Sequence, residues 1–350
     1  MKAEWKKHEL VFKRPAGTSR GALHTKPSYF LRVQHSSGQV AYGECALLPG
    51  LSPDDLPHYE EVLTATCTWW EEGMEANAIL GQLAHWPSIR FGWEMVLASF
   101  GLLDLGPWQH TAFEEGQAGL PINGLIWMGT FDFQQAQLHQ LLEKGFDCVK
   151  FKIGRDYFSG GRALLEEARH LRPSLEIRVD ANGAFSPEEA RRVLQDLHQL
   201  QVHSIEQPLA TGQWEQMADL IQWSPVPIAL DEDLIFCPPH QRMAMLEITQ
   251  PDYIILKPSL LGGWKASEEW IQLAQQLGVD YWTTSALESQ LGLLWIARFA
   301  ALHPVPRPQG LGTGSLYNNN LASDLSIKQQ ALWRSNVKDE QKVATDRLWP

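Results

Sequence analysis

Two lysines, Lys150 and Lys152, lie two positions apart in the apolar segment 148–154 of this 350-residue chain. The segment has the composition of a β-strand, whose side chains alternate between faces, so both lysines point to the same side. The residues on the other face are apolar and helical segments flank the strand, which predicts a covered strand with its lysines inside a closed sheet. Two buried ammonium groups side by side favour the neutral amine, the form in which a lysine acts as a base. The alternative is an edge strand whose lysines face water.

Five strand-like runs downstream of these lysines each end in a polar residue, with steps of 25 to 28 residues counted from Lys152: Asp180, Glu206, Asp231, Lys257 and Ser285. Each interval also contains a helical segment. The period is therefore one strand, one helix and two short loops, which is typical of a β/α barrel. In such barrels the reacting groups come from the C-terminal ends of the strands, where these residues fall.

The three carboxylates end consecutive predicted strands. Neighbouring strands lie about 4.8 Å apart, so Asp180, Glu206 and Asp231 converge closely enough to bind one ion. A hard divalent cation would remove their mutual repulsion, and an all-carboxylate set favours Mg²⁺, or Mn²⁺, over Zn²⁺. The sequence leaves open which of residues 231–233, all acidic, supplies the third ligand. The alternative is three unrelated helix-capping or surface acids.

Lysines flank this triad in the chain, Lys152 before it and Lys257 after it. A substrate bound to the ion would therefore have ammonium or amine groups beside it. This arrangement suits removal of a proton from a carbon next to a carboxylate, with the metal holding the enediolate charge.

The remaining elements divide the chain into three parts. Residues 1–118 lack the period and are predicted to form a separate α+β unit, with strands at 10–13, 29–35 and 40–44 and helices at 54–75 and 88–105. Residues 119–314 contain the barrel, with its first strand expected at 120–127 and its last helix at 290–302. The Ser-Pro-Glu-Glu start at 186–189 marks another helix clearly. The barrel ends in a glycine-rich eighth strand end at 310–314 that lacks an acid. Residues 315–350 are expected to return to the first unit.

Composition limits the partners. A formal net charge of −12 argues against nucleic acids and anionic membranes, and no run approaches the roughly 20 apolar residues of a membrane span. The four cysteines show no paired spacing and the first ten residues no apolar signal-peptide stretch, so we expect a cytoplasmic protein. A small-molecule carboxylate remains as substrate, and the sequence leaves a homo-oligomer open.

Together these residues resemble the enolase superfamily over nearly the whole chain. The resemblance implies an α+β capping domain over a modified TIM (β/α) barrel, and Mg²⁺ held by Asp180, Glu206 and Asp231 in the motifs Val-Asp-Ala-Asn-Gly, Ile-Glu-Gln-Pro and Leu-Asp-Glu-Asp. It also implies that Lys152 of Lys-Phe-Lys is the acid/base and that Lys257 of Ile-Leu-Lys-Pro faces it.

Three stretches, 43–52, 257–263 and 285–289, look like those of the o-succinylbenzoate synthase family of the menaquinone pathway. That resemblance implies dehydration of 2-succinyl-6-hydroxy-2,4-cyclohexadiene-1-carboxylate, with Lys152 moving both protons on one face and Lys257 remaining charged. It further implies substrate contacts on the succinyl side, and Lys150 is expected near the same site. Arg178 shares a strand face with Asp180 and is also expected there, with a buried structural arginine as the alternative. The expected succinyl-side residues are Gly262, Gly263, Ser285 and Ser289.

Three other functions are weighed against this one. An epimerase of N-acylamino acids or dipeptides would use Lys152 and Lys257 symmetrically, but dipeptide epimerases of the superfamily usually carry an Asp-x-Asp that 310–314 lacks. Acid-sugar dehydratases typically need a histidine after the seventh strand, and 283–289 has none. A barrel kept as a non-catalytic binding module would be expected to lose part of the set, and all five positions are occupied.

Overall fold

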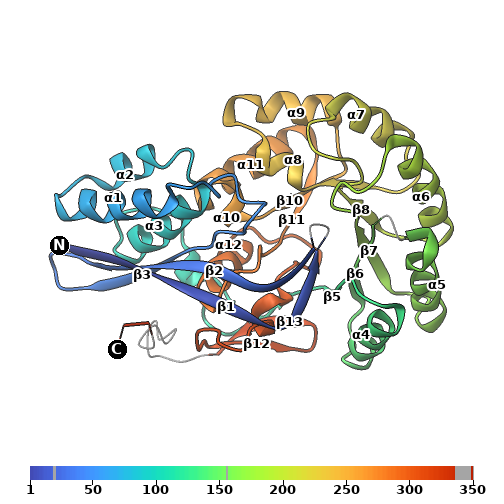
Figure 1. Ribbon diagram of the computed structural model, residues 1–350, viewed down its shortest axis with the longest axis horizontal. Helices are drawn as coiled ribbons and strands as arrows, with labels where there is room; N and C mark the ends of the chain where they lie inside the picture. Colours follow the sequence, from blue (N-terminus) through green and yellow to red (C-terminus); the bar gives the residue numbers. More distant parts are fainter. Residues whose placement is uncertain (19–20, 155–156, 336–347, 350) are drawn as a thin grey trace.

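The computed structural model describes residues 1–18, 21–154, 157–335 and 348–349, and its strands form three sheets (Figure 1). Long antiparallel strands make the first sheet: β1 (Lys2–Thr18), β2 (Gly21–Gln34) and β3 (Val40–Cys45). The helices that follow are α1 (Tyr59–Glu71), α2 (Ala76–Gln82) and α3 (Pro87–Ser99). Helix α3 packs on β3 and α1 on β1, and large apolar side chains such as Trp70 and Trp93 fill the space between them.

This N-terminal unit has more strand than the sequence indicates. β1 is 17 residues long rather than the four predicted, because its exposed charged residues mask the apolar alternation outside 10–13. Helix α2 was not predicted, since its seven residues are too few to show a period.

Seven parallel strands in chain order make the second sheet, which curls into the barrel on the right of Figure 1. They are β5 (Gly124–Ile126), β6 (Cys148–Lys152), β7 (Glu176–Asp180), β8 (Ser204–Glu206), β9 (Ile228–Leu230), β10 (Tyr253–Leu256) and β11 (Asp280–Thr283). The intervening and following helices are α4 (Phe131–Glu143), α5 (Gly161–Leu171), α6 (Pro187–Gln199), α7 (Trp214–Trp223), α8 (Glu232–Phe236), α9 (Arg242–Thr249), α10 (Pro258–Leu261), α11 (Gly263–Leu277) and α12 (Gln290–Leu302). The predicted β/α period is therefore confirmed.

The barrel closes at a seam between β5 and β11. Two isolated bridges, Ile122 with Gln309 and Thr284 with Gly310, take the place of an eighth strand. The predicted eighth strand end instead continues into a short 3-10 turn, η4 (Gly312–Ser315). The predicted first strand, 120–127, is also divided, because Leu120–Pro121 (β4) leaves the barrel to pair with the C-terminal hairpin.

That hairpin, β12 (Leu325–Lys328) and β13 (Ala331–Arg334), forms the third sheet with β4. Just before it the chain runs beside β1, where Lys13 N donates to Leu316 O at 2.8 Å and Asn318 N donates to Val11 O at 2.9 Å. Residues 336–347 and 350 of the predicted C-terminal segment lie outside the described residues. Among the helices that the structure describes, none has both the length and the apolar character needed to cross a bilayer.

Candidate active site

Strand register aligns the predicted catalytic residues across the barrel. Lys152 of β6 pairs in register with Asp180 of β7, and Asp180 pairs with Glu206 of β8. Asp231 and Lys257 directly follow β9 and β10 at the same end of the sheet. All five side chains therefore come from C-terminal strand ends, as the interval between them predicts.

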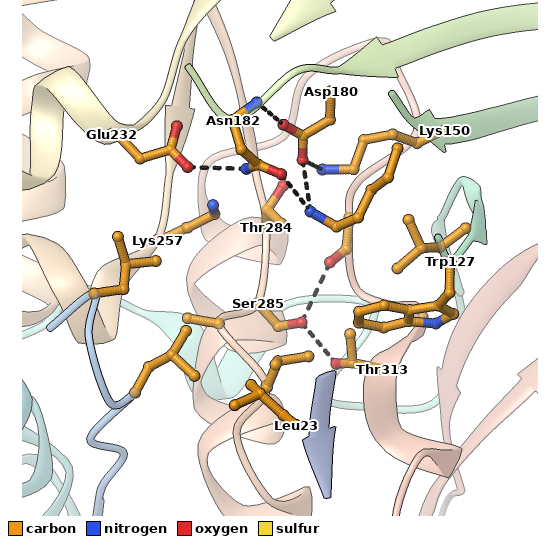
Figure 2. A pocket seen from close by; sticks show the side chains of 18 of the residues that line it. Leu23, Trp127, Lys150, Asp180, Asn182, Glu232, Lys257, Thr284, Ser285 and Thr313 are labelled. Atoms are coloured by element: carbon orange, nitrogen blue, oxygen red, sulfur yellow. Dashed lines mark hydrogen bonds and ion pairs between the residues drawn. The ribbon is translucent and has the colours of Figure 1, made fainter. Parts of the chain in front are cut away.

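The two lysines of β6 contact different partners, although they share a face. Lys150 Nζ lies 3.0 Å from Glu206 Oε2 and 3.3 Å from Asp180 Oδ2. Lys152 Nζ donates to Asn182 Oδ1 at 2.8 Å and lies 3.2 Å from Asp180 Oδ2 (Figure 2 shows the Asp180 and Asn182 side chains). Lys150 is thus the more deeply placed of the two, and Lys152 reaches further along the cavity.

Lys257 belongs to the opposite wall, since three strands separate β6 from β10 in the sheet. Pro258 begins α10 directly after it, which ends the strand and leaves Lys257 as the helix N-cap residue. Its ammonium donates to Asp231 Oδ2, and the carboxylate is fully buried. Lys150 and Lys257 therefore approach the centre from opposite sides (Figure 2).

Burial and the neighbouring charges set the protonation of these groups. Burial works to lower the pKa of Lys150, but the Glu206 and Asp180 carboxylates outweigh it and raise that pKa to about 12. The pKa of Lys257 is raised in the same way against burial, chiefly by Asp231. The sequence predicts that the two lysines of β6 favour the neutral amine. Lys150 instead has a raised pKa, because carboxylates lie between the ammonium groups.

The carboxylates respond unequally to the same surroundings. Burial and the nearby Asp180 charge raise the pKa of Glu206 to about 7. Burial also raises the pKa of Asp231 and of Glu232. At Asp180 the Lys152 and Lys150 ammonium groups outweigh burial and lower the pKa of the carboxyl. Several buried acids in one place thus repel one another and depend on cations for their charged form.

A divalent cation fits this donor set. Asp231 Oδ1 and Glu232 Oε2 are buried oxygens without a hydrogen-bond partner, close to Glu206, whose pKa is raised by burial and by the Asp180 charge. Oxygen donors of this kind suit Mg²⁺ or Mn²⁺. Among the described residues, no three acidic, His or Cys side chains are grouped closely enough to hold a metal ion. The carboxylates instead pair with the ammonium groups of Lys150 and Lys257.

An apolar cavity extends from these charged groups. Leu23, Leu48 and Leu51 of the N-terminal unit line it, as does Trp127, which follows β5. On the far side, Ser285 and Thr313 hydroxyl groups lie 2.6 Å apart in its wall (Figure 2). The cavity can therefore hold a molecule with an ionised end at the lysines and a mostly apolar body.

The structure places several residues of the predicted succinyl side elsewhere. Ser285 lines the cavity, but Ser289 is buried and caps α12 by accepting from Leu291 N at 3.2 Å. Gly262 and Gly263 form the left-handed break between α10 and α11 and are not part of the lining. The cavity lining therefore does not support substrate contacts for these three residues, and their predicted role stays a prediction.

Arg178 also lies away from the cavity. Its side chain enters the barrel two residues before Asp180, toward the N-terminal ends of the strands, and its guanidinium stacks 4.4 Å from the Trp282 ring centroid. It donates to Pro308 O at 2.9 Å and pairs with Glu176 at 2.6 Å. Arg178 is therefore a buried structural arginine, which was the competing interpretation of its position in the strand.

Asn182 is a site residue that the sequence interpretation did not assign, and it contacts Glu232, one of the three acids left open as the third ligand. Asn182 Oδ1 accepts from Lys152, and its Nδ2 donates to Glu232 Oε1 at 2.9 Å. Asn182 has a φ of 44°, a left-handed conformation that asparagine tolerates better than most residues. The Asp-Ala-Asn-Gly order carries that signal, because Asn and Gly together at a strand end indicate a tight turn that points a side chain back into the site.

Known proteins resemble this chain along most of its length. A family model described as "Enolase C-terminal domain-like" matches residues 134–332. The o-succinylbenzoate synthase of Desulfotalea psychrophila is 43% identical, over 93% of this chain and 97% of the relative. The crystal structure of MenC from the same organism superimposes with a TM-score of 0.83 at 38% identity, covering 95% of this chain and 99% of that one. L-Ala-D/L-Glu epimerase from Bacillus subtilis shares the fold, with a TM-score of 0.83 at 20% identity and 96% coverage of both chains.

Proposed function

The chain belongs to the enolase superfamily, and from that premise we propose that it is an o-succinylbenzoate synthase. The reaction would be the syn-dehydration of 2-succinyl-6-hydroxy-2,4-cyclohexadiene-1-carboxylate to 2-succinylbenzoate. The observation that carries the proposal is the 43% identity to a synthase of that name across 93% of the chain, together with a complete set of two lysines and three carboxylates on the strand ends.

Lys152 is the proposed acid/base. In its neutral form it would remove the proton from the carbon next to the substrate carboxylate, and it would then return that proton to the departing hydroxyl on the same face. Asn182 and Asp180 hold its Nζ at 2.8 and 3.2 Å, which fixes the nitrogen at the mouth of the charged end. One base therefore suffices for both proton transfers of a syn elimination.

Lys257 would remain charged throughout. Its ammonium is buried on the opposite wall, and the surrounding acids keep its pKa raised. It would stabilise negative charge that develops on the substrate carboxylate after the proton is removed. An unequal pair, with one lysine moving protons and one holding charge, matches a dehydratase.

Members of the superfamily generally use Mg²⁺, and we infer that Asp180, Glu206 and Asp231 hold it here. When bound, the cation would supply positive charge beside the substrate carboxylate. Glu232 is a competing ligand, because its Oε2 is buried without a partner next to the same site.

The apolar walls would hold the rest of the substrate. Leu23, Leu48 and Trp127 can cover the ring and exclude water from it, while the Ser285 and Thr313 hydroxyl groups offer hydrogen bonds to a polar end. This is consistent with a substrate that carries a second acid on a short chain.

An N-acylamino acid racemase is the second candidate, because lysines on opposite walls can also act one on each face of a carbon. The two activities differ in their products. The purified protein should convert the cyclohexadiene acid to 2-succinylbenzoate. The reaction is monitored by the appearance of this aromatic product. In parallel, a panel of N-succinylamino acids in deuterated water tests exchange at the α-carbon. Rapid exchange with no 2-succinylbenzoate formed would overturn the synthase assignment in favour of the racemase.

A further inference from the structure

A buried carboxylate of the N-terminal unit reaches into the barrel at the start of α12. Glu44, near the end of β3, accepts from Ser289 N at 2.9 Å and from Gly292 N at 2.8 Å, and it also accepts from the Ser289 hydroxyl. The first turn of a helix has unpaired N–H groups and a partial positive charge, so a carboxylate there is held firmly. Glu44 and Ser289 are fully buried, which shields the contact from water.

Glycines make this approach possible. A Cβ on Gly292 would lie 2.8 Å from Glu44 Oε2, so any side chain there would displace the carboxylate. Strand β3 itself is fixed against α3, where a Cβ on Gly43 would lie 2.1 Å from the carbonyl oxygen of Gly92. A Cβ on Gly92 would lie 2.5 Å from Cys45 Sγ. The backbone that carries Glu44 therefore has little room to shift.

The contact lies between two walls of the cavity. Four residues after Glu44, Leu48 lines the cavity from the N-terminal unit, and Ser285 lines it from the loop that ends at Ser289. Within that loop Glu288 accepts from Ala286 N at 2.7 Å and from the Ser259 hydroxyl of α10. The loop is thus held internally by one acid and attached to the N-terminal unit by another.

A third wall segment joins the same cluster. Ser28 donates to Glu44 Oε1 at 2.8 Å, and the buried Lys26 donates to Ser28 at 3.0 Å. Lys26 is three residues after Leu23, which lines the cavity. Burial lowers the pKa of Lys26, against which the Glu44 and Glu288 carboxylates act. The cluster therefore connects the two described segments of the N-terminal unit that line the cavity, near Leu23 and at 48–51, with the 284–287 loop.

We propose that Glu44 is a positioning residue: it holds the 48–51 segment and the 284–287 loop at a fixed separation around the end of the substrate remote from the lysines. Glu44 is not itself part of the lining, so it acts through the backbone of these two segments. The inference rests on the proposed function for the identity of that substrate.

The variant Glu44→Gln tests it. Its amide keeps the size of the side chain but turns one acceptor into a donor, which would face the N–H groups of Ser289 or Gly292. We expect KM for the cyclohexadiene acid to rise about tenfold, the equivalent of one lost hydrogen bond, while kcat changes much less. In hydrogen exchange followed by mass spectrometry, a peptide covering 284–287 should exchange faster than in the wild type.

Glu114→Gln is the matched control. Glu114 is also largely buried and bonds to the same helix, accepting from Arg298 Nε at 3.0 Å and Nη2 at 2.8 Å, but in the C-terminal half of α12. It should lower thermal stability without changing KM or exchange at 284–287. Ser289→Ala is the second variant, which removes one of the three bonds from α12 to Glu44 together with the cap on Leu291 N. It should shift KM in the same direction as Glu44→Gln.

The outcomes separate the two hypotheses. A wild type that makes no 2-succinylbenzoate contradicts the proposed function, and exchange at 284–287 still tests the positioning role. Glu44→Gln with wild-type KM and wild-type exchange in that loop would overturn the inference and leave the proposed function intact. If Glu44→Gln, like Glu114→Gln, lowers only thermal stability and leaves KM and exchange at 284–287 unchanged, Glu44 has only a structural role.

Discussion

At the scale of single residues, the three lysines of the site differ in the groups that they contact. Lys150, Lys152 and Lys257 are all within the barrel, but the shortest contact of each is with a different acid or amide. Lys150 pairs with two carboxylates, so it is suited to balancing charge. Lys152 has a neutral partner in Asn182 as well as Asp180, which leaves it the better placed of the β6 pair to exchange a proton with a substrate.

Lys152→Ala should therefore lower kcat by about 10³-fold or more, since the variant lacks the only base proposed for both proton transfers. Lys257→Ala should also reduce turnover, through lost charge stabilisation. Steady-state formation of 2-succinylbenzoate measures both. Lys265→Ala, which removes a lysine paired with Glu268 outside the cavity, is the control and should retain wild-type rates. A Lys152→Ala enzyme with near-normal kcat would exclude the proposed role.

Glu206→Gln should weaken divalent-metal binding by at least tenfold, because it removes the charge of the central acid in the row. Titration of the metal-free protein with Mn²⁺, followed by its paramagnetic signal, measures the affinity without turnover. Exhaustive chelation should likewise abolish wild-type activity, and added Mg²⁺ should restore it. Full activity after chelation would contradict the inferred metal dependence.

At the scale of elements, strand ends and helix starts decide where each group lies. The regular interval predicted the C-terminal ends of β7 and β8 at Asp180 and Glu206, because a covered strand with a polar last residue has a strong pattern. The β/α period also predicted a helix after Ser285, and α12 is observed from 290 to 302 as expected. Those elements carry or support the acids, so the charged end of the site was predictable from the sequence.

The seam and the substrate end were not predictable in the same way. The sequence predicts one strand where the structure has two, Leu120–Pro121 and Gly124–Ile126. They are separate because the first pairs with the C-terminal hairpin, which lies more than 200 residues later in the chain. Ser289 and Gly263 have motif positions that suggest substrate contact, but tertiary contacts from Glu44 and Glu94 take them out of the cavity. Local pattern contains no information on such long-range contacts.

Helix α6 allows an element-scale prediction. Its start was predicted from the sequence, and Ser186 accepts from Glu189 N at 3.3 Å while Glu189 accepts from Ser186 N at 2.9 Å. Ser186→Ala should lower the free energy of unfolding by about 1 kcal/mol, and Ser186→Asp, which keeps an acceptor, should restore most of it. Urea denaturation measures both. An alanine variant as stable as the wild type would show that the cap contributes nothing here.

At the scale of the whole molecule, the N-terminal unit is attached to the barrel by two acids that both reach helix starts. Glu44 contacts α12, and Glu94 of α3 accepts from Trp264 N at the start of α11. Gly263 has a φ of 94°, and a Cβ there would lie 2.1 Å from Glu94 Oε2, so the fit depends on a glycine. Each acid is fully buried, which makes the junction sensitive to ionisation.

This junction should make stability depend on pH. Burial raises the pKa of Glu94 from 4.5 to about 7, against the lowering effect of Arg90. Between these values the folded chain keeps a proton that the unfolded chain has lost, so stability from this group is greatest at low pH and falls as pH rises to about 7. The loss would be at most about 3 kcal/mol. Glu94→Gln cannot ionise, so its unfolding free energy should fall less than that of the wild type between pH 5 and 7.5. Parallel pH curves for the two proteins would rule out this contribution.

The seam of the barrel has a consequence for divergence. The lysines and carboxylates come from consecutive strands β6 to β10 or directly after them, whereas the seam at 309–313 contributes backbone and one hydroxyl group to the cavity. Mutations at the seam and in the N-terminal wall can therefore change the shape of the accepted molecule without altering the groups that move protons. Barrels of this fold could come to accept different substrates by this route while retaining the groups that move protons.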